Sequence, residues 1–266
     1  MKKAIHYLLL AFFMVLLLFS SWKLVSALLS YKEGQDSYAS LEQYVSFETV
    51  ATEPLPSEQT EEPIATETEE TDKTPWPKVD FEQLEAINPD VVGWICIEGT
   101  NINYPVVQGE DNDYYLSHLF DRSANSSGSI FLDSYCAPDF TDSHSILYGH
   151  HMKDKTMFYS LMEYKDQAFY DTHTEGMLIT PQGNYRIRFF SGYVSDTWSN
   201  AWERDFVTND FETWLQDIAE RSCFSSPYAP VPGDNIVTLS TCSYEFETAK
   251  FVLHGYIAER EEETEA

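Results

Sequence analysis

Basic residues are scarce in this chain of 266 residues, in which 16 Lys and Arg stand against 44 Asp and Glu. Part of the net charge of −28 lies in residues 53–72, with eight carboxylates, and in residues 259–266, with five carboxylates and one arginine. The first segment carries a net charge of −8 and the second −4, so the remainder of the chain still carries −16. A surface of this sign repels phosphate backbones, which argues against a nucleic-acid partner, whereas a cationic amine would be attracted.

Cysteine is scarce as well, with four residues, and no internal repeat is visible. Outside the cell an even count permits disulfides, but a working thiol at Cys242 would leave three cysteines and at most one bridge. We expect Cys96, Cys136 and Cys223 to be small buried apolar residues instead.

Residues at metal-ligand spacing are also sparse. Zinc could in principle be bound by His144, His150 and His151, but no fourth Cys, Asp or Glu stands at ligand spacing. No motif requires calcium, and no organic cofactor is indicated. The sequence therefore predicts a protein without a metal or a cofactor.

A long apolar run is present at the N-terminus. Lys2 and Lys3 precede an apolar segment at residues 7–29, and these roughly 23 residues suffice to cross about 30 Å of hydrocarbon. As an anchor, this segment would leave residues 1–6 in the cytoplasm and the rest of the chain outside. It also fits a signal peptide, with a small-residue end at 25–27. We expect the single-pass anchor, and both alternatives export the protein.

The rest of the chain divides by composition. Residues 30–78 are predicted to be an acidic linker rich in Glu, Thr and Pro, a disordered spacer that holds the folded part away from the membrane. Residues 79–260 are predicted to form the folded domain, followed by an acidic tail at 261–266.

Strand signals dominate the predicted domain. Short segments rich in β-branched and aromatic residues are bounded by Gly, Pro, Asn or Asp. They lie at residues 91–99, 102–108, 128–134, 145–150, 176–181, 185–194, 235–241 and 250–258. Helices are predicted at 80–90, 156–164 and 208–221. The pattern predicts a mainly β fold, a closed or nearly closed barrel of about eight strands with peripheral helices.

The segment "IVTLSTCSYEFETAKFVLHGYI" carries the first candidate chemistry. Cys242 ends one predicted strand and Lys250 begins the next. If these strands pair antiparallel, the two residues face each other, and the cation would lower the pKa of the thiol and stabilise an oxyanion. On composition alone, a cysteine at a strand end is more often a core or rim residue than a nucleophile.

A nucleophilic cysteine needs a partner for proton transfer. His150 and His151 directly follow the strand "SILYG", about ninety residues before Cys242. One histidine at a strand end is usually structural, but two in this position with a strand-end cysteine suggest acid–base chemistry. The order of histidine before cysteine argues against papain-like enzymes, in which the cysteine comes first.

Together these residues resemble the sortase family, cysteine transpeptidases of Gram-positive bacteria, and its class B branch in particular. "TLSTC" matches the TLxTC signature of sortases, and "LYGHHM" followed by "TMF" resembles the class B histidine segment. "NPDVVGWICIEGTNINYPVVQGEDNDYYLSH" and "GSIFLD" resemble the early strands of that branch. The likeness covers residues 81–259 and implies a closed eight-stranded sortase-type barrel as the catalytic domain.

The resemblance implies roles for individual residues. Cys242 would attack the threonine carbonyl of a sorting signal of the LPxTG or NPxTN kind. His150 would protonate the departing amine and then deprotonate the incoming one, and His151 would be structural. The substrate groove would be lined by Ser240, Thr241, Tyr148, Asn112, Leu116 and, as a guess in a segment that aligns poorly, Trp202.

One position departs from the family pattern, because Lys250 stands where sortases have an arginine. An arginine donates two hydrogen bonds from a planar fork, whereas a lysine offers a point charge on a flexible stem. We therefore expect a slower sortase. It would transfer surface proteins or pilins to an amine, either a cell-wall cross-bridge peptide or a pilin lysine. The alternatives are a sortase-like binding module without turnover and a hydrolytic cysteine peptidase of the cell surface.

Overall fold

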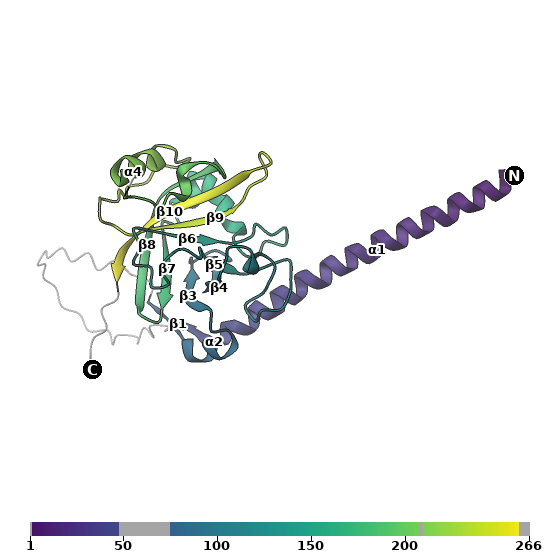
Figure 1. Cartoon of the computed structure of the whole chain (residues 1–266), viewed down its shortest axis with the longest axis horizontal. Helices are drawn as coiled ribbons and strands as arrows, with labels where there is room; N and C mark the ends of the chain where they lie inside the picture. The colour runs from purple at the N-terminus through teal and green to yellow at the C-terminus, as the bar shows by residue number, and fades with distance from the viewer. Residues whose placement is uncertain (1, 48–74, 208–209, 261–266) are drawn as a thin grey trace, which may run out of the picture.

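Eight strands close into one barrel in the computed structural model, which describes residues 2–47, 75–207 and 210–260. They are β3 (Val91–Cys96), β4 (Asn103–Val107), β5 (Ile130–Leu132), β6 (His144–Tyr148), β7 (Glu175–Thr180), β8 (Gly183–Asp196), β9 (Ile236–Cys242) and β10 (Ala249–Arg260). Their order around the barrel is β10-β8-β7-β3-β4-β5-β6-β9. Neighbours are antiparallel except β4–β5 and β6–β9, which are parallel. The predicted closed barrel of eight strands is confirmed, since each predicted segment forms one of them (Figure 1).

Strand β9 shows why several predicted strands are almost continuously apolar. Val237 and Leu239 belong to the main core, whereas Ile236 packs in a second cluster with Trp214 of helix α4 (Phe211–Glu220). Because helices and loops cover the outside of this part of the barrel, both faces of the strand are buried.

The peripheral helices begin at polar caps. Asp80 accepts a hydrogen bond from the Gln83 amide at the start of α2 (Phe81–Ile87), and Asp210 caps α4 in the same way. The remaining short helical elements are η1 (Glu42–Tyr44), η2 (Tyr114–Leu116), η3 (Tyr159–Lys165), α3 (Gln167–Tyr170) and η4 (Asn200–Trp202).

The helix predicted at 156–164 differs from the structure, in which the 3₁₀ helix η3 begins only at Tyr159. Met157 has a φ of 57°, which an α-helix does not tolerate, and its amide donates to the Tyr104 hydroxyl at 3.0 Å. Both features delay the start of the helix.

Helix α1 (Lys2–Leu41) extends as a long rod from the barrel (Figure 1). The apolar side chains of its N-terminal part are exposed. It is long and apolar enough to cross a membrane. Its C-terminal end packs on the barrel, where Leu41 is buried and the Tyr38 hydroxyl donates to the Gly128 carbonyl at 2.6 Å.

The segment predicted as a linker is therefore ordered at both ends. Beyond α1, strand β1 (Val45–Phe47) pairs antiparallel with β2 (Pro77–Val79), so the strands that flank the acidic segment lie side by side. The acidic residues 48–74 and the tail 261–266 lie outside the described residues, and the spacer stays a prediction. Ordered structure nevertheless begins well before the domain boundary predicted at residue 79.

Candidate active site

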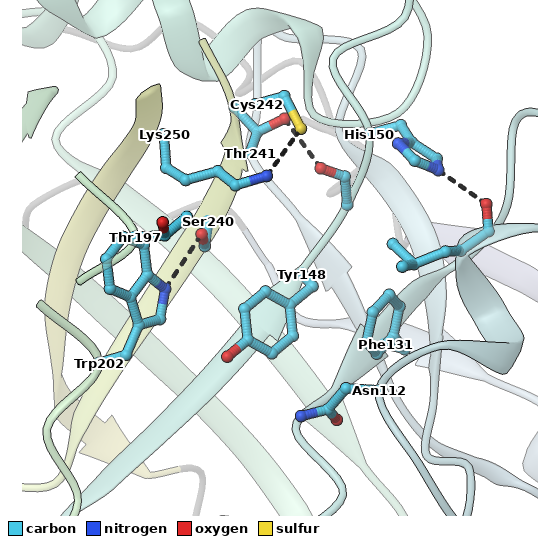
Figure 2. Close-up of a pocket in the computed structure, with 12 residues that line it drawn as sticks. Asn112, Phe131, Tyr148, His150, Thr197, Trp202, Ser240, Thr241, Cys242 and Lys250 are labelled. Carbon is cyan, nitrogen blue, oxygen red and sulfur yellow. Dashed lines mark hydrogen bonds between the residues drawn. The ribbon is translucent and has the colours of Figure 1, made fainter. Parts of the chain in front are cut away.

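Pairing of β9 with β10 brings Cys242 and Lys250 together. The two strands are antiparallel with these residues as direct partners, which confirms the register expected from the sequence. The Lys250 Nζ donates a hydrogen bond to the Cys242 Sγ at 3.0 Å (Figure 2). The cation therefore lies where it stabilises a thiolate.

His150 reaches the same edge of the barrel from β6. Because β6 and β9 run parallel, with Tyr148 beside Ser240, both strands end at this edge. The connecting residue has no room for a side chain, since a Cβ at Gly149 would lie 2.7 Å from the Phe158 ring. The Thr241 hydroxyl donates to the Gly149 carbonyl at 2.8 Å and fixes this turn.

The orientation of His150 follows from its backbone partner. The Nε2 lies 2.7 Å from the Leu116 carbonyl oxygen, which can only accept, so Nε2 carries the hydrogen (Figure 2). In the neutral ring Nδ1 is then free to take a proton from the Cys242 thiol, with which His150 interacts. The Leu116 carbonyl thus supplies the orienting third group that cysteine–histidine pairs require.

Electrostatics distinguish Cys242 from the other cysteines. Interaction with His150 lowers the pKa of Cys242 to about 7 against the opposing effect of burial, and Lys250 adds to the lowering. The Cys242 interaction in turn raises the pKa of His150. Burial instead raises the pKa of Cys96 to about 12 and that of Cys136 to about 11. Only Cys242 is thus prepared to react as a thiolate near neutral pH.

All four cysteines are free thiols. Cys96 and Cys136 are buried, as expected, but Cys223 is exposed, which contradicts its expected place in the core. It follows the end of α4, where the chain turns at the surface. No cluster of three or more His, Cys, Asp or Glu suited to a metal ion occurs within residues 2–47, 75–207 and 210–260.

A groove of about 360 Å³ surrounds the thiol (Figure 2). Its lining includes every residue that the sequence suggested for catalysis or substrate binding, together with three that it did not suggest, Phe131, Gly149 and Thr197. Phe131 lies within the quoted segment "GSIFLD", so that signal was available. Thr197 precedes the segment that aligned poorly, and no pattern in the sequence marks it.

Asp133 binds two residues that line the groove, Asn112 and Tyr148, and was also missed. It is 3% exposed. It accepts hydrogen bonds at 3.0 Å from Asn112 and from the Tyr148 hydroxyl, and it pairs with Arg204 at 3.1 Å. The Asn112 amide oxygen in turn accepts from the Ser134 amide at 2.8 Å. Asn112 is therefore held at both ends of its amide by the protein.

His151 does not line the groove, and its ring reaches the Cys242 backbone and not the thiol. Its ring packs between Tyr159 and Tyr244, with centroid distances of 5.2 and 5.3 Å, and burial lowers its pKa. It is absent from the residues that line the groove. The two adjacent histidines therefore have different surroundings, and only His150 faces the thiol.

A model of the sortase domain matches residues 95–258, more than half of the chain. The chain belongs to the sortase family. It is 37% identical to Sortase B of Listeria monocytogenes over 179 residues, 66% of this chain and 73% of that one. It is 39% identical to Sortase B of Staphylococcus aureus over 175 residues, 65% of this chain and 72% of that one. The resemblance to the class B branch is thereby confirmed.

Solved structures agree. The Staphylococcus aureus sortase B–substrate complex superposes with a TM-score of 0.64 at 38% identity, covering 67% of this chain and 84% of that one. Sortase B from Bacillus anthracis gives a TM-score of 0.69 at 31% identity, covering 88% of this chain and 100% of that one. Family membership identifies this sortase as a cysteine transpeptidase for anchoring surface proteins.

The pH dependence of thiol alkylation should report the lowered pKa. We expect the rate of Cys242 with iodoacetamide to increase through pH 7, because the thiolate is present above its pKa of about 7 and lost below it. At pH 7 this thiol should react roughly 5- to 10-fold faster than one with the ordinary value of 9.0, because its larger ionised fraction outweighs the lower nucleophilicity of its thiolate. Alkylation at each cysteine would be followed by mass spectrometry of peptides.

Cys223 provides the internal reference for that experiment. It is exposed, and partial desolvation by its neighbours raises its pKa. Its alkylation rate should therefore still be increasing at pH 9, where that of Cys242 has levelled off. Equal pH profiles for Cys242 and Cys223 would show that neither His150 nor Lys250 stabilises the thiolate.

Proposed function

We propose that this sortase is anchored in the membrane by α1 and uses Cys242 as nucleophile, His150 as acid and base, and Lys250 as the stabilising cation. The observation that carries this assignment is the meeting of these three side chains in one groove. Cys242 is the only cysteine of the chain with a lowered pKa. A groove that served binding alone would have no need of an activated thiol.

The reaction follows from the geometry. The Cys242 thiolate attacks the threonine carbonyl of a sorting signal of the LPxTG or NPxTN kind, and the oxyanion that forms lies near the Lys250 ammonium. The imidazolium of His150 gives its proton to the departing amine, which leaves a thioester on Cys242. An incoming amine then loses a proton to His150, attacks the thioester and releases the thiolate.

An amine acceptor is supported by two observations. A sortase B has been solved in complex with triglycine, which presents a free amino group. The net charge of −28 also favours the approach of a cationic amine. We propose a cell-wall cross-bridge peptide or a pilin lysine as the acceptor, and a surface protein or pilin as the substrate.

Localisation rests on α1. We propose that residues 7–29 cross the membrane once, with Lys2 and Lys3 in the cytoplasm and the catalytic domain at 79–260 outside. The contacts of Tyr38 and Leu41 with the barrel support a short distance between the membrane and the domain.

The full chain in detergent tests the proposal. Fluorescence-quenched peptides with LPxTG, NPxTN and SPxTG signals would be incubated with and without triglycine, and the products identified by mass spectrometry. Cleavage with transfer to triglycine supports the transpeptidase. Cleavage by water alone even at high triglycine would indicate the hydrolytic peptidase, and tight binding without cleavage would indicate the binding module.

Lys250 offers a prediction of its own. Lys250→Ala should lower kcat/KM by roughly 10²- to 10³-fold, because both the thiolate and the oxyanion lose their cation. Lys250→Arg should raise it a few-fold, since the planar fork can donate two hydrogen bonds. Both values come from initial rates with the best peptide of the panel. A lower rate in Lys250→Arg would mean that the groove is built for the smaller ammonium group.

A further inference from the structure

A continuous line of buried polar side chains lies behind the groove and takes no part in the reaction. It crosses four neighbouring strands, with His144 on β6, Thr238 on β9, His254 on β10 and Tyr193 on β8. Thr238 and His254 are fully buried, and His144 and Tyr193 are 2% and 4% exposed. All four ring nitrogens of the two histidines have a partner.

The hydrogen bonds in this line can run in one direction only. His144 Nδ1 lies 2.6 Å from the Glu203 carbonyl oxygen, which accepts, so Nδ1 carries the hydrogen. In the neutral ring Nε2 then accepts from the Thr238 hydroxyl at 2.6 Å. Thr238 has one hydrogen, so it must accept from His254 Nδ1 at 2.7 Å. His254 Nε2 finally accepts from the Tyr193 hydroxyl at 3.2 Å.

Both histidines are neutral, as this direction requires. Burial lowers the pKa of His144 to about 4 and that of His254 well below its ordinary value. The His144 ring packs on Trp214 at a centroid distance of 4.8 Å, while Arg204 and Asp133 act on His144 and Arg221 acts on His254 from nearby. A polar line in such a place is costly unless every member is satisfied, and it specifies one arrangement of the groups it joins.

The buried line ends at the Glu203 carbonyl, which belongs to a wall of the groove. Glu203 lies between Trp202, which lines the groove, and Arg204, which pairs at 3.1 Å with Asp133, the buried partner of Asn112 and Tyr148. The Trp202 indole donates to the Ser240 hydroxyl at 3.2 Å (Figure 2). Three interactions thus hold this segment: Trp202 with Ser240, Arg204 with Asp133, and the Glu203 carbonyl with His144. Only the bond to the Glu203 carbonyl comes from the buried line.

We propose that His144, Thr238, His254 and Tyr193 form a positioning relay, which holds the Trp202 wall in the place that binding of the sorting signal requires. The relay residues do not touch the substrate, and they act through the Glu203 carbonyl. This inference rests on the proposed function, because it assigns the groove to a sorting-signal peptide.

Matched substitutions distinguish the loss of a hydrogen bond from a change in side-chain volume. In His144→Asn the amide nitrogen can occupy the place of Nδ1 and keep the bond to Glu203, whereas in His144→Gln it occupies the place of Nε2 and that bond is lost. Thr238→Val removes the hydroxyl at nearly constant shape, and Thr238→Ser retains it. The Thr238 pair serves as an independent test in case a variant at His144 does not fold.

Two measurements on the full chain in detergent test the relay. Hydrogen exchange of residues 199–206 should increase about tenfold in His144→Gln and Thr238→Val, with α2 unchanged as the reference. In a Cys242→Ala background, the dissociation constant of a labelled sorting-signal peptide should increase about tenfold in the same two variants. Thr238→Ser should stay within about twofold of the parent in both measurements, and His144→Asn, which keeps the bond to Glu203 but loses the one to Thr238, should increase both by less than His144→Gln.

Each remaining outcome decides against the proposal. Unchanged exchange would show that the relay does not hold the wall, and increased exchange with unchanged affinity would show that the wall does not serve the peptide. If Cys242 alkylation also lost its pH profile in the variants made with the thiol intact, the effect would be a general loosening of the barrel. A parent that binds no peptide, together with increased exchange in the variants, would refute the proposed function and leave the relay structural.

Discussion

Cys242→Ala is expected to abolish both cleavage and transfer, with a loss of at least about 10⁴-fold in kcat/KM. No other side chain in the groove can form the thioester, since the groove contains no second cysteine. Binding of the sorting-signal peptide should persist, because its contacts come from the groove walls. Peptide cleavage and anisotropy of a labelled peptide, measured on the same preparation, separate the two effects.

Cys223→Ala is the matched control for this substitution. It removes an exposed thiol without touching the groove and should leave the rate of cleavage unchanged. Residual transfer in Cys242→Ala that disappears in the double variant would assign the chemistry to Cys223 and overturn the assignment of the nucleophile.

Local pattern was sufficient to predict the barrel and the position of the thiol. Each strand is a short segment of β-branched and aromatic residues between turn residues, so its existence follows from neighbouring positions alone. The facing of Cys242 and Lys250 is also local, because a short connection between two adjacent antiparallel strands sets their register.

Contacts between distant segments were beyond such a prediction. Asp133 gathers partners that lie 21, 15 and 71 residues away in the chain, and no periodicity links these positions. The docking of α1 depends on Tyr38 and a carbonyl 90 residues later. Likewise, His144 was considered only as a zinc ligand, since its partner Thr238 is 94 residues away.

His150→Ala is expected to lower kcat/KM for peptide cleavage by roughly 10²- to 10⁴-fold at neutral pH. Two roles are lost together. The largest cause of the lowered pKa of Cys242 is removed, so that pKa should rise, and the departing amine loses its proton donor. Alkylation of Cys242 and peptide cleavage, both measured across pH 6–10, separate these roles.

Alkylation requires only the thiolate, so it should recover in His150→Ala as the pH exceeds the raised pKa of Cys242. Cleavage should not recover, because the acid that protonates the amine is still missing. His151→Ala is the matched control, since this neighbouring ring packs between Tyr159 and Tyr244 and reaches only the backbone of Cys242, so its cleavage rate should be retained. Recovery of cleavage in parallel with alkylation would limit His150 to ionising the thiol and require a different proton donor.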